Sequence, residues 1–224
     1  IQRRFQKVVE EAPAPRIPAN VRSEMADSAC RLAASQKYSG AGTVEFILNA
    51  KNNLFYFLEM NTRIQVEHPT TEMISKQDIV YLQLMQAIGE KPENLIDEPP
   101  YLSGHSIECR LYAEKPEKNF IPSPGHIKLL RLPRQSDAIR VEASYIEGDT
   151  ITPFYDPMIA KIISFGEDRD RAIQRMLLAL EQCRLEDIAT NLNLLKAILR
   201  DPAFERAQTN TTYLEKNIAT LLGS

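Results

Sequence analysis

The sequence has no tryptophan, only eight glycines and only three cysteines among its 224 residues. With so few glycines it contains no glycine-rich phosphate loop. Cys30, Cys109 and Cys183 are far apart, odd in number and without a Cys-x-x-Cys pair, so no disulfide framework is expected. They are typical of reduced core residues in an intracellular protein. The three histidines are too scattered for a metal site, and we interpret all of them as structural: His68, His105 and His126.

Blocks of one charge and long apolar runs are also missing. The formal net charge is −3 and both signs are mixed along the chain, so there is no electrostatic footprint for nucleic acid or an anionic membrane. No apolar run approaches the length of a membrane span, and the first residues, Ile1-Gln-Arg-Arg-Phe5, are no secretory signal. Because the chain opens without methionine inside a segment that resembles a strand, we expect it to be part of a longer polypeptide.

Hydrophobic periodicity predicts a chain that mixes helices and strands. Helices are expected over 18–37, 69–77, 79–88, 169–183, 190–199 and 211–222, and strands over 42–48, 55–59, 105–113, 127–132, 139–143 and 158–165. Side chains expected to cap helices are Asn20, Asp78, Asp168 and Thr190. The helix over 79–88 is apolar on most sides, so we expect it to be well buried.

A hairpin is predicted where Asn49-Ala-Lys-Asn-Asn53 joins two strand-like segments. If the hairpin is centred near Asn52, Glu45 lies opposite Glu59 and Thr43 lies opposite Asn61. Directly paired residues have Cβ atoms roughly 4.5 to 5.5 Å apart, where like charges destabilise a sheet. The two facing carboxylates therefore favour a bound cation.

The stretch beyond the hairpin keeps its polar side chains on one face if it is extended: Glu59, Asn61, Arg63, Gln65 and Glu67. Oxygen ligands of this kind suit Mg²⁺, which one or two carboxylates hold together with substrate phosphates. We therefore expect a nucleotide-bound magnesium site, with Arg63 able to clamp an anion and Glu67 able to move a proton. An exposed, solvated hairpin is the alternative interpretation of the same alternation.

The motif Glu59-Met-Asn-Thr-Arg-Ile-Gln-Val-Glu-His-Pro69, with Gly40-Ala-Gly-Thr-Val-Glu-Phe46 before it, closely resembles the signature of biotin carboxylase. This family is the ATP-grasp component of biotin-dependent carboxylases such as acetyl-CoA carboxylase. Three further motifs are similar to the family: Glu108-Cys-Arg110, Phe120-Ile-Pro-Ser-Pro-Gly125 and Tyr155-Asp-Pro-Met158. The resemblance covers essentially the whole chain.

The resemblance implies an α+β fold in which residues 1–90 form the second half of an ATP-grasp domain. A proline-bearing linker over 91–104 and a biotin carboxylase C-terminal domain over 105–224 are expected to follow. The family's N-terminal domain, glycine-rich lid, phosphate-binding lysine and adenine hinge have no counterpart in this sequence. We therefore expect the isolated chain to lack carboxylation activity.

The resemblance also implies a nucleotide site. By the family's pattern Glu45, Glu59 and Asn61 bind the Mg²⁺ or Mn²⁺ that bridges the phosphates of ATP, and Gln2 and Phe5 lie with the two glutamates at the nucleotide. Phe5 departs from that pattern, because many members carry a histidine there. Phenylalanine can pack against a ring but cannot donate a hydrogen bond.

The remaining roles concern bicarbonate and biotin. The resemblance assigns bicarbonate to Lys7, Arg63, Gln65 and the backbone of Val66, and makes Glu67 the base that deprotonates it. The resulting oxyanion attacks the γ-phosphate and forms carboxyphosphate, a step that depends on positioning and charge neutralisation. Carboxyphosphate then gives CO₂ to biotin, whose ureido oxygen the match of Arg110 stabilises. Without the resemblance, we would interpret Arg110 as a charged residue that keeps an edge strand soluble.

The predicted function is thus ATP-dependent carboxylation of biotin, with Arg63, Glu67 and Arg110 as the catalytic residues. No Ala-Met-Lys-Met attachment motif is present, so the biotin is expected on a separate carrier domain or protein. A carboxyltransferase and a second copy of the chain are the other expected partners, with Arg140 near the dimer contact. The expected location is the cytoplasm, or alternatively the mitochondrial matrix.

Two other functions stay open. A bicarbonate-using ATP-grasp ligase of the carbamoyl-phosphate-forming type would share Glu59-x-Asn61-x-Arg63 and the metals, but would not need Arg110. A non-catalytic fragment that only dimerises or docks a carrier is the second alternative. The sequence does not indicate the final carboxyl acceptor, which the carboxyltransferase selects.

Overall fold

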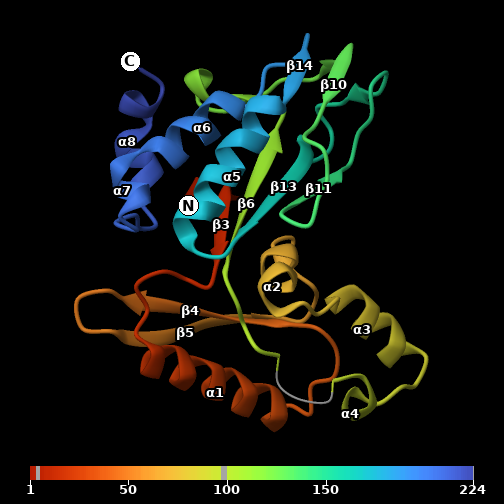
Figure 1. The fold of residues 1–224 in the computed structure, drawn as a ribbon, viewed down its shortest axis with the longest axis vertical. Helices are drawn as coiled ribbons and strands as arrows, with labels where there is room; N and C mark the ends of the chain where they lie inside the picture. The colour runs from red at the N-terminus through yellow and green to blue at the C-terminus, as the bar shows by residue number, and fades with distance from the viewer. Residues whose placement is uncertain (4–5, 97–99, 224) are drawn as a thin grey trace. The chain divides into compact units, whose positions relative to one another are not determined.

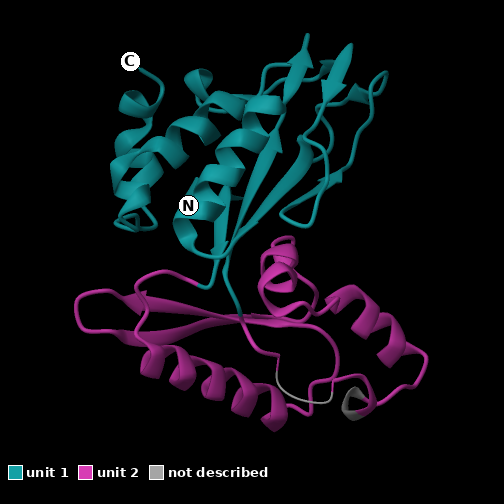
Figure 2. Ribbon diagram, in the orientation of Figure 1, with its two compact units in different colours: residues 1–13, 103–224 teal, residues 14–102 magenta. Residues whose placement is uncertain are grey.

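A computed structural model describes residues 1–3, 6–96 and 100–223, with the backbone alone described for residues 92 and 93. The chain divides into two units, one containing Ile1–Pro13 and Ser103–Ser224 and the other containing Ala14–Leu102 (Figure 2). The first residues join the later ones because β3 (Val9–Ala12) is hydrogen-bonded to β6 (His105–Tyr112). The domain ranges 1–90 and 105–224 stay a prediction about the family's domains.

The unit formed by Ala14–Leu102 is built on the predicted hairpin. Its elements are α1 (Ala19–Ser35), β4 (Thr43–Asn49), β5 (Leu54–Asn61), α2 (His68–Ser75), α3 (Ile79–Ala87) and α4 (Pro92–Leu95) (Figure 1). The hairpin register is the predicted one, with Glu45 opposite Glu59 and Thr43 opposite Asn61. A register shift between Glu45 and Phe46 then places Phe46 opposite Phe57.

Helix α3 is capped as predicted but is not buried. Asp78 accepts a hydrogen bond from Tyr81 N at 2.7 Å, and Glu72 Oε1 of α2 accepts one from Ile79 N at 2.6 Å. No residue of α3 is buried, and Leu84 is 63% exposed. The expectation of a well-buried helix is therefore wrong, because an apolar sequence favours burial without supplying the surface that covers it. Asn20 is not a cap either, since α1 begins at Ala19 after Pro18 and has no side-chain cap.

The other unit is organised around a four-stranded antiparallel sheet in the order β11-β13-β6-β3. The two strands not yet introduced are β11 (Ile139–Ala143) and β13 (Met158–Gly166). All eight residues of β6 are buried. Helix α5 (Arg169–Gln182) packs on one face of the sheet, where Ser164 Oγ of β13 donates to Ala172 O at 2.8 Å.

The described part of this unit has twelve further elements. They are β1 (Gln2–Arg3), β2 (Gln6–Lys7), β7 (Glu114–Lys115), η1 (Pro116–Lys118), β8 (Ile121–Pro122), β9 (Gly125–His126), β10 (Leu129–Arg131), β12 (Thr150–Ile151), β14 (Arg184–Glu186), α6 (Leu192–Arg200), α7 (Pro202–Glu205) and α8 (Tyr213–Leu221). The strand expected over 127–132 is thus shorter than predicted. Asp168 caps α5 as predicted, accepting from Arg171 N at 2.8 Å. In the described part of the chain, no helix is long and apolar enough to cross a bilayer.

The cap predicted for α6 is displaced by one residue. The N-cap is Asn191, not Thr190, although Thr190 Oγ1 accepts from Leu192 N at 3.4 Å. The Asn191 side chain instead accepts from Tyr112 N at 2.9 Å and donates to Arg110 O at 3.0 Å. A buried amide at the start of α6 therefore fixes the backbone of β6 on both sides of Leu111.

Candidate functional site

The two opposed glutamates of the hairpin share one amide. Asn61 Nδ2 donates to Glu45 Oε1 at 3.1 Å and to Glu59 Oε1 at 3.0 Å. The hairpin register brings these three side chains to one place, since each pair of opposed residues projects from the same face. The amide thereby offsets part of the repulsion between the two carboxylates.

Gln65 and Arg63 extend this hydrogen-bonded set. Gln65 Nε2 donates to Glu45 Oε1 at 3.3 Å, and Gln65 Oε1 accepts from Arg63 Nη1 at 3.1 Å. Arg63 Nη1 also donates to Ile64 O at 3.1 Å. Gln65 is buried whereas Arg63 is exposed. The Arg63 guanidinium is therefore held through Nη1 by a buried side chain while the residue itself stays accessible to solvent.

Glu67 lies at the N-terminal end of α2, where it is the N-cap residue. Its carbonyl oxygen accepts from Thr70 N at 3.1 Å and from Thr70 Oγ1 at 2.8 Å. Its carboxylate makes no capping hydrogen bond to α2. The structure thus places Glu67 two residues after Gln65, with Val66 between them, at the start of a helix.

The donor set of the hairpin fits a magnesium ion. Two facing carboxylates and an adjacent amide supply the hard oxygen ligands that Mg²⁺ prefers, and phosphate oxygens and water usually complete its octahedron. Among the described residues, no group of three or more His, Cys, Asp or Glu side chains forms a metal cage. Glu45, Glu59 and Asn61 therefore suit a metal that arrives with a phosphate ligand rather than one that the protein encloses.

In the other unit, Gln2 and Lys7 are directly opposed on β1 and β2. The two side chains predicted to meet nucleotide and bicarbonate thus share one face of a small hairpin. Phe5, the remaining residue predicted at the nucleotide, lies outside the described residues.

Arg110 lies on an inner strand, so its interpretation as an edge-strand charge is wrong. The residue is 8% exposed, and its Nη2 donates to Glu10 Oε1 of β3 in an ion pair. Arg110 Nε lies 3.7 Å from Glu108 Oε1. Burial opposes the charge of Arg110, but the Glu10 carboxylate raises the pKa of Arg110 overall. The guanidinium is therefore charged and anchored on one side.

Sequence reasoning did not identify the residues that surround Arg110: Glu10, Glu108 and Asn191. Glu10 and Arg110 are one hundred residues apart, and only the pairing of β3 with β6 brings them together. The motif Glu108-Cys-Arg110 contained one signal, since its two charged residues share a face of a strand. The Asn191 contact had no signal in the sequence.

Comparison with known proteins gives two family matches. The family model of the biotin carboxylase C-terminal domain matches residues 108–216, and that of the carbamoyl-phosphate synthase L chain ATP-binding domain matches residues 1–95. The two matches divide between them most of the chain, in the order predicted from the sequence.

Relatives are similar over nearly all of the chain. Biotin carboxylase 1 of Bacillus subtilis is 44% identical over 96% of this chain and 47% of its own length. The mitochondrial methylcrotonoyl-CoA carboxylase subunit alpha of Dictyostelium discoideum is 43% identical over 96% of this chain and 30% of its own length. The chain thus spans less than half of each relative.

Solved structures are similar as well. The biotin carboxylase domain of Hydrogenobacter thermophilus 2-oxoglutarate carboxylase, a dimer in complex with MgADP, ADP and bicarbonate, has a TM-score of 0.92 and 40% identity. The match covers 99% of this chain and 48% of that one. Together with the family matches, it confirms the predicted α+β fold, the second half of an ATP-grasp domain followed by a biotin carboxylase C-terminal domain.

Proposed function

Because this chain belongs to the biotin carboxylase family, we propose that it supplies part of the site where ATP and bicarbonate carboxylate biotin on a carrier. One observation carries the proposal: the hydrogen-bonded set that runs from Glu59 and Glu45 through Gln65 to Arg63. This set contains two carboxylates that suit a metal–nucleotide complex and, connected to them by hydrogen bonds, a guanidinium that suits an anionic substrate.

In the proposed nucleotide site, Glu45, Glu59 and Asn61 hold Mg²⁺ or Mn²⁺. When bound, the metal neutralises charge on the phosphates of ATP. Asn61 keeps the two carboxylates together before the metal arrives. Gln2 and Phe5 are proposed, from the resemblance, to contact the nucleotide. The bound MgADP of the Hydrogenobacter thermophilus domain supports this assignment.

Bicarbonate is proposed to bind beside this set, to Arg63, Gln65, the backbone of Val66 and Lys7. Bicarbonate has the planar shape of a carboxylate, which suits a guanidinium donor. Gln65 orients Arg63 through the 3.1 Å hydrogen bond. Glu67, at the start of α2 two residues after Gln65, is proposed to take the bicarbonate proton.

Arg110 is proposed to act on biotin. As a ureido nitrogen of biotin loses its proton and accepts CO₂, negative charge develops on the ureido oxygen. A buried guanidinium stabilises such charge more strongly than an exposed one, because water screens it less. The ion pair with Glu10 and the Asn191 contacts to β6 keep Arg110 in place.

The partners follow from the family. A biotin carrier, a carboxyltransferase and a second copy of the chain are proposed, the last supported by the dimer of the Hydrogenobacter thermophilus domain. The carboxyl acceptor stays open, since the relatives include a methylcrotonoyl-CoA carboxylase and a 2-oxoglutarate carboxylase. The cytoplasm is the proposed location, with the mitochondrial matrix as the alternative, because the relatives include a bacterial biotin carboxylase and a mitochondrial carboxylase subunit.

A carbamoyl-phosphate-forming ligase is the second candidate, since the match over residues 1–95 is to a carbamoyl-phosphate synthase domain. The match over residues 108–216 favours the biotin reaction. Stimulation of ATP turnover by biotin separates the two functions.

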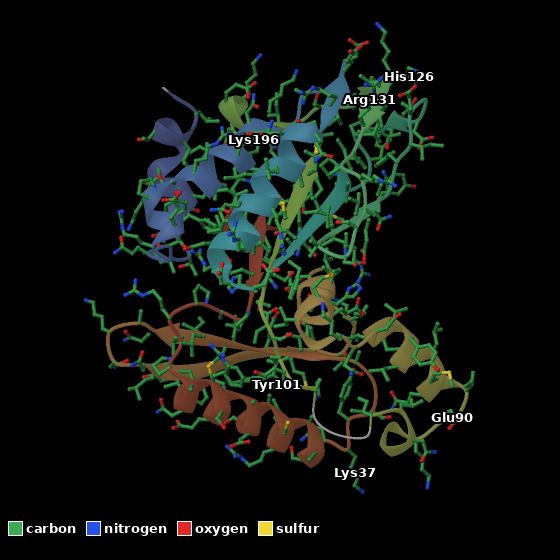
Figure 3. The ribbon with its side chains drawn as sticks, viewed as in Figure 1. Lys37, Glu90, Tyr101, His126, Arg131 and Lys196 are labelled. Carbon is green, nitrogen blue, oxygen red and sulfur yellow. The ribbon has the colours of Figure 1, made fainter. Side chains whose placement is uncertain are left out.

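The test is ADP release by the full-length protein with bicarbonate, with and without free biotin, beside Glu67→Gln. We expect biotin to stimulate ADP release, and Glu67→Gln to lower the stimulated rate by roughly 10² to 10⁴-fold, the usual contribution of a general base. Glu90→Gln is the matched control, because Glu90 is exposed just beyond α3 (Figure 3). Equal rates for Glu67→Gln and Glu90→Gln would contradict the role of Glu67, and release that ignores biotin would favour the second candidate.

A further inference from the structure

Charged side chains cover the face of the four-stranded sheet opposite α5. Directly paired residues of antiparallel strands share a face, and three such pairs are charged on both sides: Glu10 with Glu108, Arg110 with Lys161, and Lys161 with Glu142. Arg140 lies two residues before Glu142 on the same face of β11. We call this set the charged face: Glu10, Glu108, Arg110, Arg140, Glu142 and Lys161.

Most members of the charged face are joined in close ion pairs. Lys161 Nζ lies 2.6 Å from Glu142 Oε2, and Glu142 also pairs with Arg140. Glu10 pairs with Arg110. Glu108 is the exception, because neither of its carboxyl oxygens accepts a hydrogen bond from any described residue. Its contact with Arg110 Nε, at 3.7 Å, is longer than a hydrogen bond.

The surroundings of Glu108 favour its neutral form. Glu108 has no exposed surface and lies directly opposite a second carboxylate, that of Glu10. Burial raises the pKa of Glu108 to about 8, and Glu10 and Glu142 act in the same direction, against Lys161 and Arg110. With Glu108 neutral, three cations face two carboxylates on this surface, which leaves a positive charge. With Glu108 ionised, the charges balance.

We propose that Glu108 is a positioning residue for Arg110. When the Glu108 carboxyl is neutral, the Arg110 guanidinium keeps positive charge for an anionic ureido oxygen. When Glu108 is ionised, its negative charge cancels that positive charge. This inference rests on the proposed function of Arg110. The charged groups that act on Glu108 are Glu10 of β3, Arg110 of β6, Lys161 of β13 and Glu142 of β11. Tyr112 of β6 and Arg140 of β11 lie on the same face of the sheet.

The first test is the pH profile of biotin-dependent ADP release by the full-length protein. A single group with a pKa of about 8 loses about tenfold of its protonated form between pH 7 and pH 9, so the wild-type rate should fall by that factor. In Glu108→Gln, whose amide stays neutral, the ratio of the two rates should be close to one. Glu10→Gln removes the neighbouring carboxylate, so the inflection should move to lower pH.

The second test observes the carboxyl itself, by infrared difference spectroscopy between pH 7 and pH 9. Burial also raises the pKa of Glu114 to about 7, so a second protonated carboxyl contributes. The Glu108 signal is identified by its loss in Glu108→Gln. Absence of that signal in the wild-type protein would overturn the proposal, as would a Glu108→Gln rate ratio equal to that of the wild type.

The two tests distinguish failure of this proposal from failure of the proposed function. If biotin does not stimulate ADP release in the wild-type protein at any pH, both the proposed biotin reaction and the positioning role of Glu108 are contradicted, with or without the infrared signal. If biotin stimulates release but the Glu108 signal is missing, only the role of Glu108 falls. If Glu108→Gln does not fold, the pH profile of Glu10→Gln tests the proposal instead. An inflection at lower pH than in the wild-type protein supports the role of Glu108, and an unchanged inflection contradicts it.

Discussion

At the scale of single residues, Asn61 decides whether the two hairpin carboxylates can stay together. Its amide donates to both, at 3.1 Å and 3.0 Å, while Gln65 supplies a further donor to Glu45. Like charges on directly opposed strand residues destabilise a sheet. Removal of the shared donor should therefore weaken both the hairpin and the metal site that it prepares.

We predict that Asn61→Ala raises the Mg²⁺ concentration needed for half-maximal ADP release by about tenfold or more, as losses around a metal site commonly do. Titration of Mg²⁺ at fixed ATP with the full-length protein measures the shift. Asn94→Ala is the control, because Asn94 is an exposed residue of α4. An unchanged Mg²⁺ requirement for Asn61→Ala would show that Asn61 takes no part in the site.

The sequence indicated the hairpin site but not the surroundings of Arg110. Glu45 and Glu59 are joined by a short connector, so the sequence limits their pairing to a few registers. The register shift between Glu45 and Phe46, which sets the two glutamates opposite each other, was not predicted. Glu10 reaches Arg110 only through pairing of strands about one hundred residues apart, which no local pattern specifies. Helix caps show the same difference between local and distant contacts. The local cap of α3 by Asp78 was predicted, whereas the hydrogen bond of the Asn191 side chain to a strand distant in sequence was not.

At the scale of elements, Glu11 ties β3 to its neighbours on the α5 side of the sheet. His105 Nε2 lies 2.8 Å from Glu11 Oε2, and Arg169 Nε donates to the same oxygen at 2.7 Å. Arg169 also donates to Phe204 O at 2.8 Å and to Glu205 O at 2.7 Å. One carboxylate thus joins β3, β6, α5 and α7.

We predict that Glu11→Ala lowers the free energy of unfolding by on the order of 3 kcal/mol at pH 7, because it leaves the partly buried guanidinium of Arg169 and the buried His105 without their carboxylate. Burial opposes ionisation of Glu11, yet hydrogen bonds from His105 and Arg169 lower the pKa of Glu11 overall. The stabilisation is therefore present above the ordinary pKa of a glutamate and disappears as the pH falls through the lowered value.

Urea unfolding at several pH values measures this loss. The matched control is Glu181→Ala, which breaks the exposed ion pair with Arg200 and should change the free energy of unfolding by less than about 1 kcal/mol. Equal effects of the two substitutions would contradict the role of Glu11. Helix α3 differs from its sequence-based prediction at this scale, since its apolar sequence predicted burial and none of its residues is buried.

At the scale of the whole molecule, one unit is assembled from two separate parts of the chain. Ile1–Pro13 belongs with Ser103–Ser224, and Ala14–Leu102 lies between them in sequence (Figure 2). Strand β3 covers one edge of β6 and supplies Glu10 to the buried Arg110 and Glu11 to the partly buried Arg169. Without β3, strand β6 becomes an edge strand and Arg110 and Arg169 lose their carboxylates.

We therefore predict that a fragment of residues 103–224 does not unfold cooperatively and aggregates, whereas the same fragment with residues 1–13 fused before it does unfold cooperatively. A short flexible linker is sufficient, because Ala12 pairs with Ser106 and the two segments leave the sheet at the same end. Circular dichroism during urea unfolding and sedimentation velocity compare the fragments. A fusion that carries Glu10→Ala and Glu11→Ala separates the two contributions of β3, since it restores the strand pairing without the buried carboxylates. If the fragment of residues 103–224 alone is monomeric and unfolds as cooperatively as the fusion, β3 does not complete this unit.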